Sequence, residues 1–275
     1  MIKDPVTSWS EVLRIANEYE PGGWCFRGES KFGRPLKTSL EKHAIDRWGR
    51  DWGELPAIEK GLLRRFKREA HLYVNKEPSD DDLMGWLSLI RHHEGPTRLQ
   101  DWTFSFMVAL FFAVSGAKPG RPFSVWAINH NWIRGAAESQ LSGLANSLLQ
   151  NDPNAKDPKT VKEIVDADEP KPLVYPLNPM RMNRRLVLQQ GVFLVPGQLC
   201  APFMDNLNAM PDSESNVHEI AFSSELVFKQ DVIRQLLAMN ISSSTLFPGL
   251  DGFARTLTAL IPFPELRVTD EPGVE

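Results

Sequence analysis

The chain of 275 residues has only two cysteines, Cys25 and Cys200, and they form no Cys-x-x-Cys motif. Two thiols cannot build a disulfide framework, so we expect both to be reduced and buried in a cytoplasmic protein. The chain also lacks the run of roughly 20 apolar residues that a membrane-spanning helix needs. Its first residues lack the basic and then apolar layout of a secretory signal. We therefore expect a soluble protein without a membrane partner.

An excess of positive charge is missing as well. The sequence has 31 lysines and arginines against 35 aspartates and glutamates, which gives a formal net charge of -4. Such a chain has no global basic field to hold a nucleic-acid backbone, although a local basic patch is still allowed. Hydrophobic residues make up 42% and charged residues 24%, as in ordinary globular proteins. No internal repeat is present, and we expect one domain over residues 1–275.

The hydrophobic patterns predict a mixture of helices and strands. Residues 107–114 are apolar on nearly every side, which indicates a helix in the middle of a core. Residues 150–172 are acidic and rich in proline, and we expect a surface excursion there. We predict an α+β fold with a central, mainly antiparallel sheet flanked by helices. The expected strands are 24–26, 123–128, 192–196 and 217–222, and the expected helices begin near residues 9, 56, 80, 105, 129, 231 and 251.

The first candidate site residue is Arg27, which we place at the end of a strand and beside Gly28. Its guanidinium can make paired hydrogen bonds to a phosphate or a carboxylate. Gly28 would let a phosphate or a ring approach the backbone. The alternative is a structural ion pair between Arg27 and Glu29 or Asp101. Residue types alone leave both interpretations open.

The second candidate is the polar stretch from His92 to Trp102. Two adjacent histidines cannot face the same side of a helix, and no second ligand pair stands at helical spacing, so we expect no metal. A histidine held by Asp101 could act as a general base in a hydrolase or nuclease. The alternative is a structural turn with a buried salt bridge, in which Asp101 or Thr103 caps the next helix.

The third candidate is Gln189-Gln190-Gly191, directly before an apolar strand. Two amides at one spot can both donate and accept hydrogen bonds, and Arg184 and Arg185 add positive charge nearby. The alternative is a surface turn with solvated arginines.

Taken together, these stretches resemble the FRG-domain family, which is named for the triplet seen here as Phe26-Arg27-Gly28. The resemblance runs from about Trp24 to Phe253 and implies a single FRG-type domain. One departure is that Gly95 directly precedes Pro96, whereas the family has a residue between them. The residues that match the family pattern are Phe26 to Gly28, Ser30, Pro35, Leu36, His93, Gly95 to Leu99, Asp101 to Thr103, Ala109 to Ala113, Gln189, Gly191 and Phe193.

The order of the motifs also resembles ADP-ribosyltransferases of the arginine–serine–glutamate type. This second resemblance implies an ADP-ribosyltransferase-like fold, with NAD as the substrate and an unknown protein or nucleic-acid acceptor. The implied catalytic residues are Arg27, Thr103 and Gln190, with Asp101 as a candidate substitute acid, whereas His93 is a catalytic candidate only for the hydrolase or nuclease. The implied NAD-binding residues are Arg27, Gly28, Ser30, Thr97, Arg98, Trp102, Ser105 and Gln189.

One departure from the second resemblance concerns the catalytic carboxylate. Cleavage of the bond between nicotinamide and ribose develops positive charge, which a carboxylate stabilises, whereas Gln190 carries no charge. Glu29 or Asp101 could substitute for the missing acid. Three functions therefore stay open: an ADP-ribosyltransferase-like enzyme or NAD glycohydrolase, a non-catalytic nucleotide-binding module, and a hydrolase or nuclease that uses His92 or His93. In the first two, we expect the site where Arg27, Asp101, Thr103 and Gln190 meet.

Overall fold

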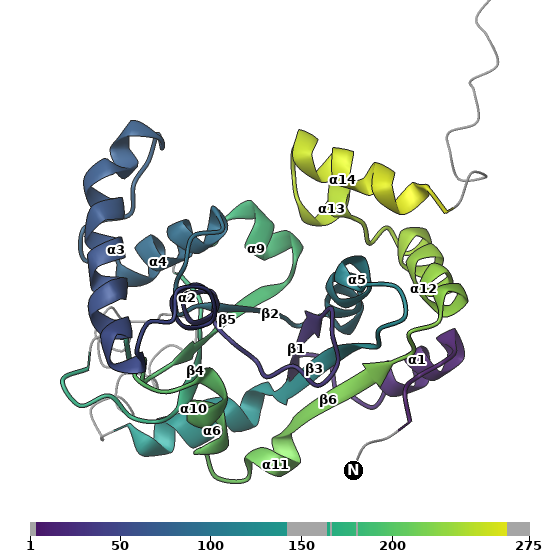
Figure 1. Cartoon of the computed structure of the whole chain (residues 1–275), viewed down its shortest axis with the longest axis horizontal. Coiled ribbons are helices and arrows are strands. Elements are labelled where there is room, and N and C mark those ends of the chain that lie inside the picture. The colour runs from purple at the N-terminus through teal and green to yellow at the C-terminus, as the bar shows by residue number, and fades with distance from the viewer. Residues whose placement is uncertain (1–3, 142–163, 166, 180, 263–275) are drawn as a thin grey trace, which may run out of the picture.

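The computed structural model describes residues 4–141, 164–165, 167–179 and 181–262 (Figure 1). The predicted α+β class is confirmed, since one six-stranded sheet has helices packed around it. The strand order in the sheet is β4-β5-β2-β1-β3-β6, and each of its five neighbouring pairs is antiparallel. The strands are β1 (Trp24–Glu29), β2 (Gln100–Thr103), β3 (Phe123–Asn129), β4 (Val174–Leu177), β5 (Gly191–Pro196) and β6 (Val217–Phe222).

The helices cover the sheet and extend beyond both of its ends (Figure 1). In the first half of the chain they are α1 (Trp9–Ala16), α2 (Ser39–Glu41), the π-helix η1 (Lys42–Arg47), the 3-10 helix η2 (Trp52–Glu54), α3 (Leu55–Glu69), the 3-10 helix η3 (Ala70–Leu72), α4 (Leu83–His92), α5 (Phe106–Gly116) and α6 (His130–Gln140). In the second half they are α9 (Arg184–Leu188), α10 (Phe203–Asn208), α11 (Ser213–Asn216), α12 (Leu226–Ala238), α13 (Ser243–Leu246) and α14 (Leu250–Leu260).

Several local predictions need correction. Strand β1 continues to Glu29, so Arg27 lies inside the strand and not at its end. Ser105 caps α5 by accepting a hydrogen bond from the Val108 amide, in place of Asp101 or Thr103. Cys25 is buried as expected, but Cys200 is exposed. Most of the expected excursion at 150–172 lies outside the described residues. Within it, 164–165 are buried and 168–172 are exposed.

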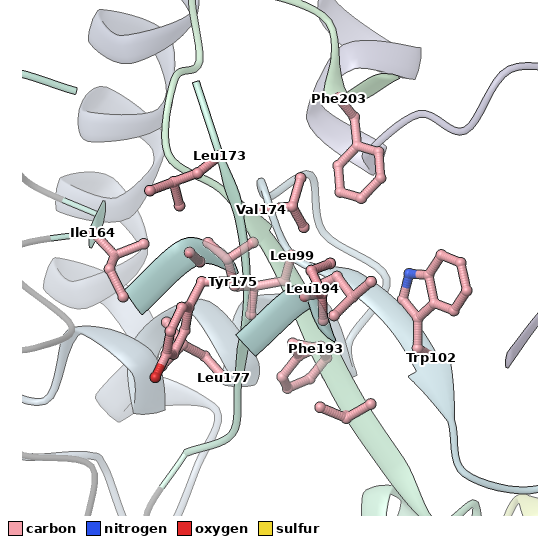
Figure 2. Packing of buried hydrophobic residues seen from close by; sticks show 14 of the residues in the cluster. Leu99, Trp102, Ile164, Leu173, Val174, Tyr175, Leu177, Phe193, Leu194 and Phe203 are labelled. Atoms are coloured by element: carbon pink, nitrogen blue, oxygen red, sulfur yellow. The ribbon is translucent and has the colours of Figure 1, made fainter. Parts of the chain in front are cut away.

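The sheet consists of two halves that meet at a narrow seam. Strand β1 pairs with β3 along six residues, but with β2 only through Phe26 and Thr103. The first half is therefore β4-β5-β2 and the second half is β1-β3-β6. We call the boundary between β1 and β2 the seam. Side chains from β2, β4 and β5 pack on one another and on Phe203 of α10 in the core of the first half (Figure 2).

Helix α5 packs directly on the second half of the sheet. Its side chains are buried almost all round, as the apolar run 107–114 predicts. Gly28 makes this close approach possible, because a Cβ atom there would lie 2.0 Å from the carbonyl oxygen of Ala109 and 2.5 Å from the amide nitrogen of Ala113. No helix in the described ranges is both long and apolar enough to cross a membrane.

Gly28→Ala should destabilise the fold, because the added methyl group would push α5 away from β1. Overpacking of this kind costs about 1–3 kcal/mol of unfolding free energy, measured by urea denaturation. The matched control is Gly61→Ala in the exposed middle of α3, where a Cβ atom meets nothing within 4 Å. It should raise stability by up to about 1 kcal/mol, because alanine has the higher helix propensity. Equal stability of the two variants would contradict the proposed role of Gly28.

Candidate functional site

Arg27 lies at the seam and connects the two halves of the sheet. Its Nε atom donates to Glu29 Oε1 at 2.8 Å, and its Nη1 atom donates to the Asp101 carbonyl oxygen at 2.7 Å. The predicted ion pair with Glu29 is therefore present, whereas Asp101 is contacted through its backbone. Burial raises the pKa of Glu29, but the positive charges of Arg27 and Lys42 outweigh it and hold that pKa below its usual value. Only 16% of the Arg27 side chain is exposed.

Further cations surround Arg27. Lys42 begins the π-helix η1 and is half-buried, and its pKa is lowered by burial and by the positive charge of Arg27. Arg34 and Arg91 act on the Lys42 ammonium in the same direction. Arg91 forms an ion pair with Asp101, but neither Lys42 nor Arg34 has an ion-pair partner among the described residues. The environment of Arg27 therefore has positive charge left over, which suits an anionic ligand.

Asp101 is held by arginine and not by histidine. Its Oδ2 atom accepts hydrogen bonds from Nε and Nη2 of Arg91. His93 is exposed, and His92 lies along a cavity of about 570 Å³ beside α4, with its Nδ1 atom buried and without a partner. Neither histidine is hydrogen-bonded to Asp101 in the described part of the chain. The described residues therefore do not form the histidine–aspartate pair that the hydrolase or nuclease requires.

Thr103 ends β2, and Gln190 lies in the turn directly before β5, the strand that pairs with β2. Thr103 pairs with Phe26 on one side and with Gly191 on the other. Its hydroxyl donates to the Gln189 carbonyl at 2.6 Å and accepts from the Ser105 amide at 3.0 Å. The hydroxyl is therefore engaged in holding the turn before β5 against β2.

The two glutamines differ in exposure. Gln189 is buried, and its Nε2 atom donates to the Leu246 carbonyl at 3.1 Å. Gln190 is exposed and adopts a positive φ of 48°, while its carbonyl accepts from the Phe104 amide at 2.9 Å. Non-glycine residues with a strained backbone conformation of this kind are concentrated at functional sites. Of the pair, only the Gln190 side chain is free to meet a ligand.

Several residues that the sequence analysis assigned to NAD binding have structural contacts instead. Thr97 is fully buried, and its backbone exchanges hydrogen bonds with the Ser39 hydroxyl. Trp102 is buried and donates from Nε1 to Gln100 Oε1 at 2.8 Å. On the face of Gly28 where we expected a ligand, the backbone of α5 fills the space. Ser30 lies beside Gly116, at the other end of that helix.

Arg98 forms a buried ion pair with Glu59 of α3. The Arg98 amide donates to Glu59 Oε1 at 3.0 Å, and Nε donates to Oε2 at 2.7 Å. Both side chains are more than 90% buried. Sequence reasoning missed this pair, and it missed Lys42, Arg34 and Arg91 as neighbours of Arg27. For Lys42 and Arg34 the density of lysine and arginine after β1 was an available signal.

The comparisons with known proteins bear on this arrangement. Residues 22–121 match the family model described as FRG domain. Over this stretch the chain is similar to an FRG domain, and the matched residues include Arg27 and the motif from Thr97 to Thr103. The comparison with curated proteins gave no match, and neither did the comparison with solved structures. Described residues contain no group of three histidines, cysteines, aspartates or glutamates that could hold a metal.

Removing Arg98 should destabilise the fold, because Glu59 would be left as an unpaired buried charge. We expect Arg98→Ala to cost about 3–5 kcal/mol of unfolding free energy, and Arg98→Met combined with Glu59→Leu to recover most of it. The exposed pair of Arg65 and Glu69 is the control, where Arg65→Ala should cost less than about 0.5 kcal/mol. Urea denaturation measures all three. A small effect of Arg98→Ala on stability would return Arg98 to the list of ligand-binding residues.

Proposed function

We propose that the chain is an ADP-ribosyltransferase-like enzyme that binds NAD at the seam. The observation that carries this proposal is the register of β1, β2 and β5. Thr103 of β2 pairs with Phe26 of β1 on one side and with Gly191 of β5 on the other. Arg27 follows Phe26 and Gln190 precedes Gly191, so the two candidate ligand residues lie on either side of Thr103. This arrangement supports one site built from β1, β2 and the start of β5.

The charge around Arg27 supports a dinucleotide ligand. Glu29 and Asp101 form ion pairs with Arg27 and Arg91, while Lys42 and Arg34 form none with the described residues. A diphosphate would supply the missing negative charge, and arginine binds phosphate oxygens in pairs. Thr103 contributes by holding the turn that presents Gln190, a role that differs from the ribose contact implied by the resemblance.

The proposed reaction needs stabilisation of positive charge on ribose. The bond between nicotinamide nitrogen and ribose C1′ breaks, and nicotinamide leaves with the electron pair. An acceptor nucleophile then bonds to C1′ and loses its proton. The carboxylates of Glu29 and Asp101 are both bound to arginines, and Gln190 is neutral. Among the described residues, neither of these two candidate acids is free, which favours a second candidate function, a nucleotide-binding module without turnover.

NAD or ADP-ribose should raise the melting temperature of the protein through Arg27. At a hundredfold excess over the dissociation constant, a ligand that binds only the folded state adds about 2.7 kcal/mol of stability. The variant Arg27→Ala with Glu29→Gln should lose this thermal shift without leaving a buried carboxylate unpaired. Glu29→Gln alone, which keeps the arginine, is the control and should retain it. Absence of a shift with either ligand in the unsubstituted protein would refute the proposal.

Gln190→Glu should increase the release of nicotinamide from NAD, because it places a carboxylate at the exposed position beside Thr103. One electrostatic contact of this kind is worth about a hundredfold in rate. Gln189→Glu is the matched control and should give no increase, since its side chain is buried against the Leu246 carbonyl. Nicotinamide release is followed by chromatography. An unchanged rate in Gln190→Glu, with NAD still bound, would select the binding module.

A further inference from the structure

The segment 31–70 is strongly basic in a chain that is acidic as a whole. It holds eleven lysines and arginines against six aspartates and glutamates, a formal charge of +5 where the whole chain has -4. The remaining residues therefore carry -9. A local excess of this kind produces a positive field over one part of the surface, although the average charge of the chain conceals it.

The acidic residues of this segment are largely occupied by specific partners. Asp46, Glu54 and Glu69 form ion pairs with Lys37, Arg50 and Arg65. Glu59 is bound to Arg98, and Glu41 accepts hydrogen bonds from two backbone amides. Among the described residues, this leaves eight cations of the segment without an ion-pair partner: Lys31, Arg34, Lys42, Arg47, Lys60, Arg64, Lys67 and Arg68. Lys67 instead donates to the Asp80 carbonyl.

Three of these cations form a stripe along α3. Lys60, Arg64 and Arg68 are each four residues apart, so they lie on one face of the helix over about 12 Å. All three are exposed, and α3 stands at the left edge of the molecule (Figure 1). Like charges at this spacing destabilise a helix. A partner of opposite charge would relieve that repulsion.

Exposed aromatic rings accompany the cations. Trp48, at the end of η1, is 70% exposed, and Arg47 lies over its ring at 5.5 Å. Tyr73, just after α3, is 82% exposed. A small core of Leu40, Ala44, Leu55 and Leu199 packs α2, η1 and the start of α3 against one another. Aromatic rings beside unpaired cations are the features that single-stranded nucleic acid uses, by stacking its bases and pairing its phosphates.

We propose that residues 31–73 bind a single-stranded nucleic acid, with its phosphates on Arg47, Lys60, Arg64 and Arg68 and its bases on Trp48 and Tyr73. Lys42 and Arg34 belong to this segment and also lie beside Arg27, so the surface leads to the seam. If the proposed function holds, the bound strand is the acceptor of ADP-ribose. That last step rests on the proposed function, whereas the binding of the strand does not.

The test is fluorescence anisotropy with a short labelled RNA strand and the matching DNA strand, over a range of salt concentrations and without NAD. Each phosphate contact on a single strand contributes about 0.7 to the slope of log affinity against log salt. The variant Lys60→Gln, Arg64→Gln, Arg68→Gln should therefore reduce the slope by about 2. Trp48→Ala should weaken binding about tenfold with an unchanged slope.

The control variant is Arg14→Gln, Lys118→Gln, Arg121→Gln, which removes the same charge from exposed positions outside the segment. It should leave the slope unchanged. Absence of binding to both strands, or an equal loss in the two triple variants, would overturn the proposal. So would competition by inorganic polyphosphate as strong as by the strand, with no effect of Trp48→Ala, since any polyanion would then suffice.

The acceptor role is tested separately with labelled NAD and the bound strand. Label on the strand would support it, and a bound strand that stays unlabelled while nicotinamide is released would overturn it. A thermal shift with NAD but no strand binding would remove this inference and leave the proposed function in place. Strand binding without a thermal shift by NAD would refute the proposed function and leave this inference in place.

Discussion

The contact between β1 and the backbone of α5 is the constraint on which the site depends. It requires a residue without a side chain at Gly28, because the carbonyl of Ala109 occupies the place of a Cβ atom. Since successive residues of a strand face opposite sides, Arg27 and Glu29 are then both directed to the face away from α5. The phenylalanine–arginine–glycine triplet thus combines a core residue, a charged residue and a packing contact in three consecutive positions.

Much of the sequence motif serves the architecture around the site. Thr97, Arg98, Trp102 and Thr103 are buried. Thr97, Arg98 and Thr103 have hydrogen bonds to other parts of the chain, and Trp102 has one to Gln100 of the same strand. Their effect is to fix β2 against α3 on one side and against the turn before β5 on the other. Few side chains are therefore left to contact a ligand. They are Arg27, Gln190 and residues outside the motif.

Local patterns predicted the fold better than they predicted the site. The apolar run of α5 and the apolar alternation of β3 were sufficient to predict these elements, because both patterns are visible within the element itself. The pairing of Arg98 with Glu59 joins residues 39 positions apart, and no local pattern can show it. The glycine at 28 had a physical explanation either as a ligand contact or as a helix contact, and only the position of α5 decides between them. The basic segment 31–70 was not predicted, because the net charge of the whole chain conceals the local excess of lysine and arginine.

The order of the strands has a consequence for how the chain folds during synthesis. Strand β1 finds its long partner only in β3, which the ribosome makes nearly a hundred residues later. At roughly 5–20 residues per second, β1 stays without that partner for about 5–20 s. Its sequence is apolar and aromatic at Trp24 and Phe26, so the nascent chain exposes an unpaired, aggregation-prone strand edge for that time. Chaperones that cover such edges during synthesis would then affect the yield of folded protein more than the stability of the final fold does.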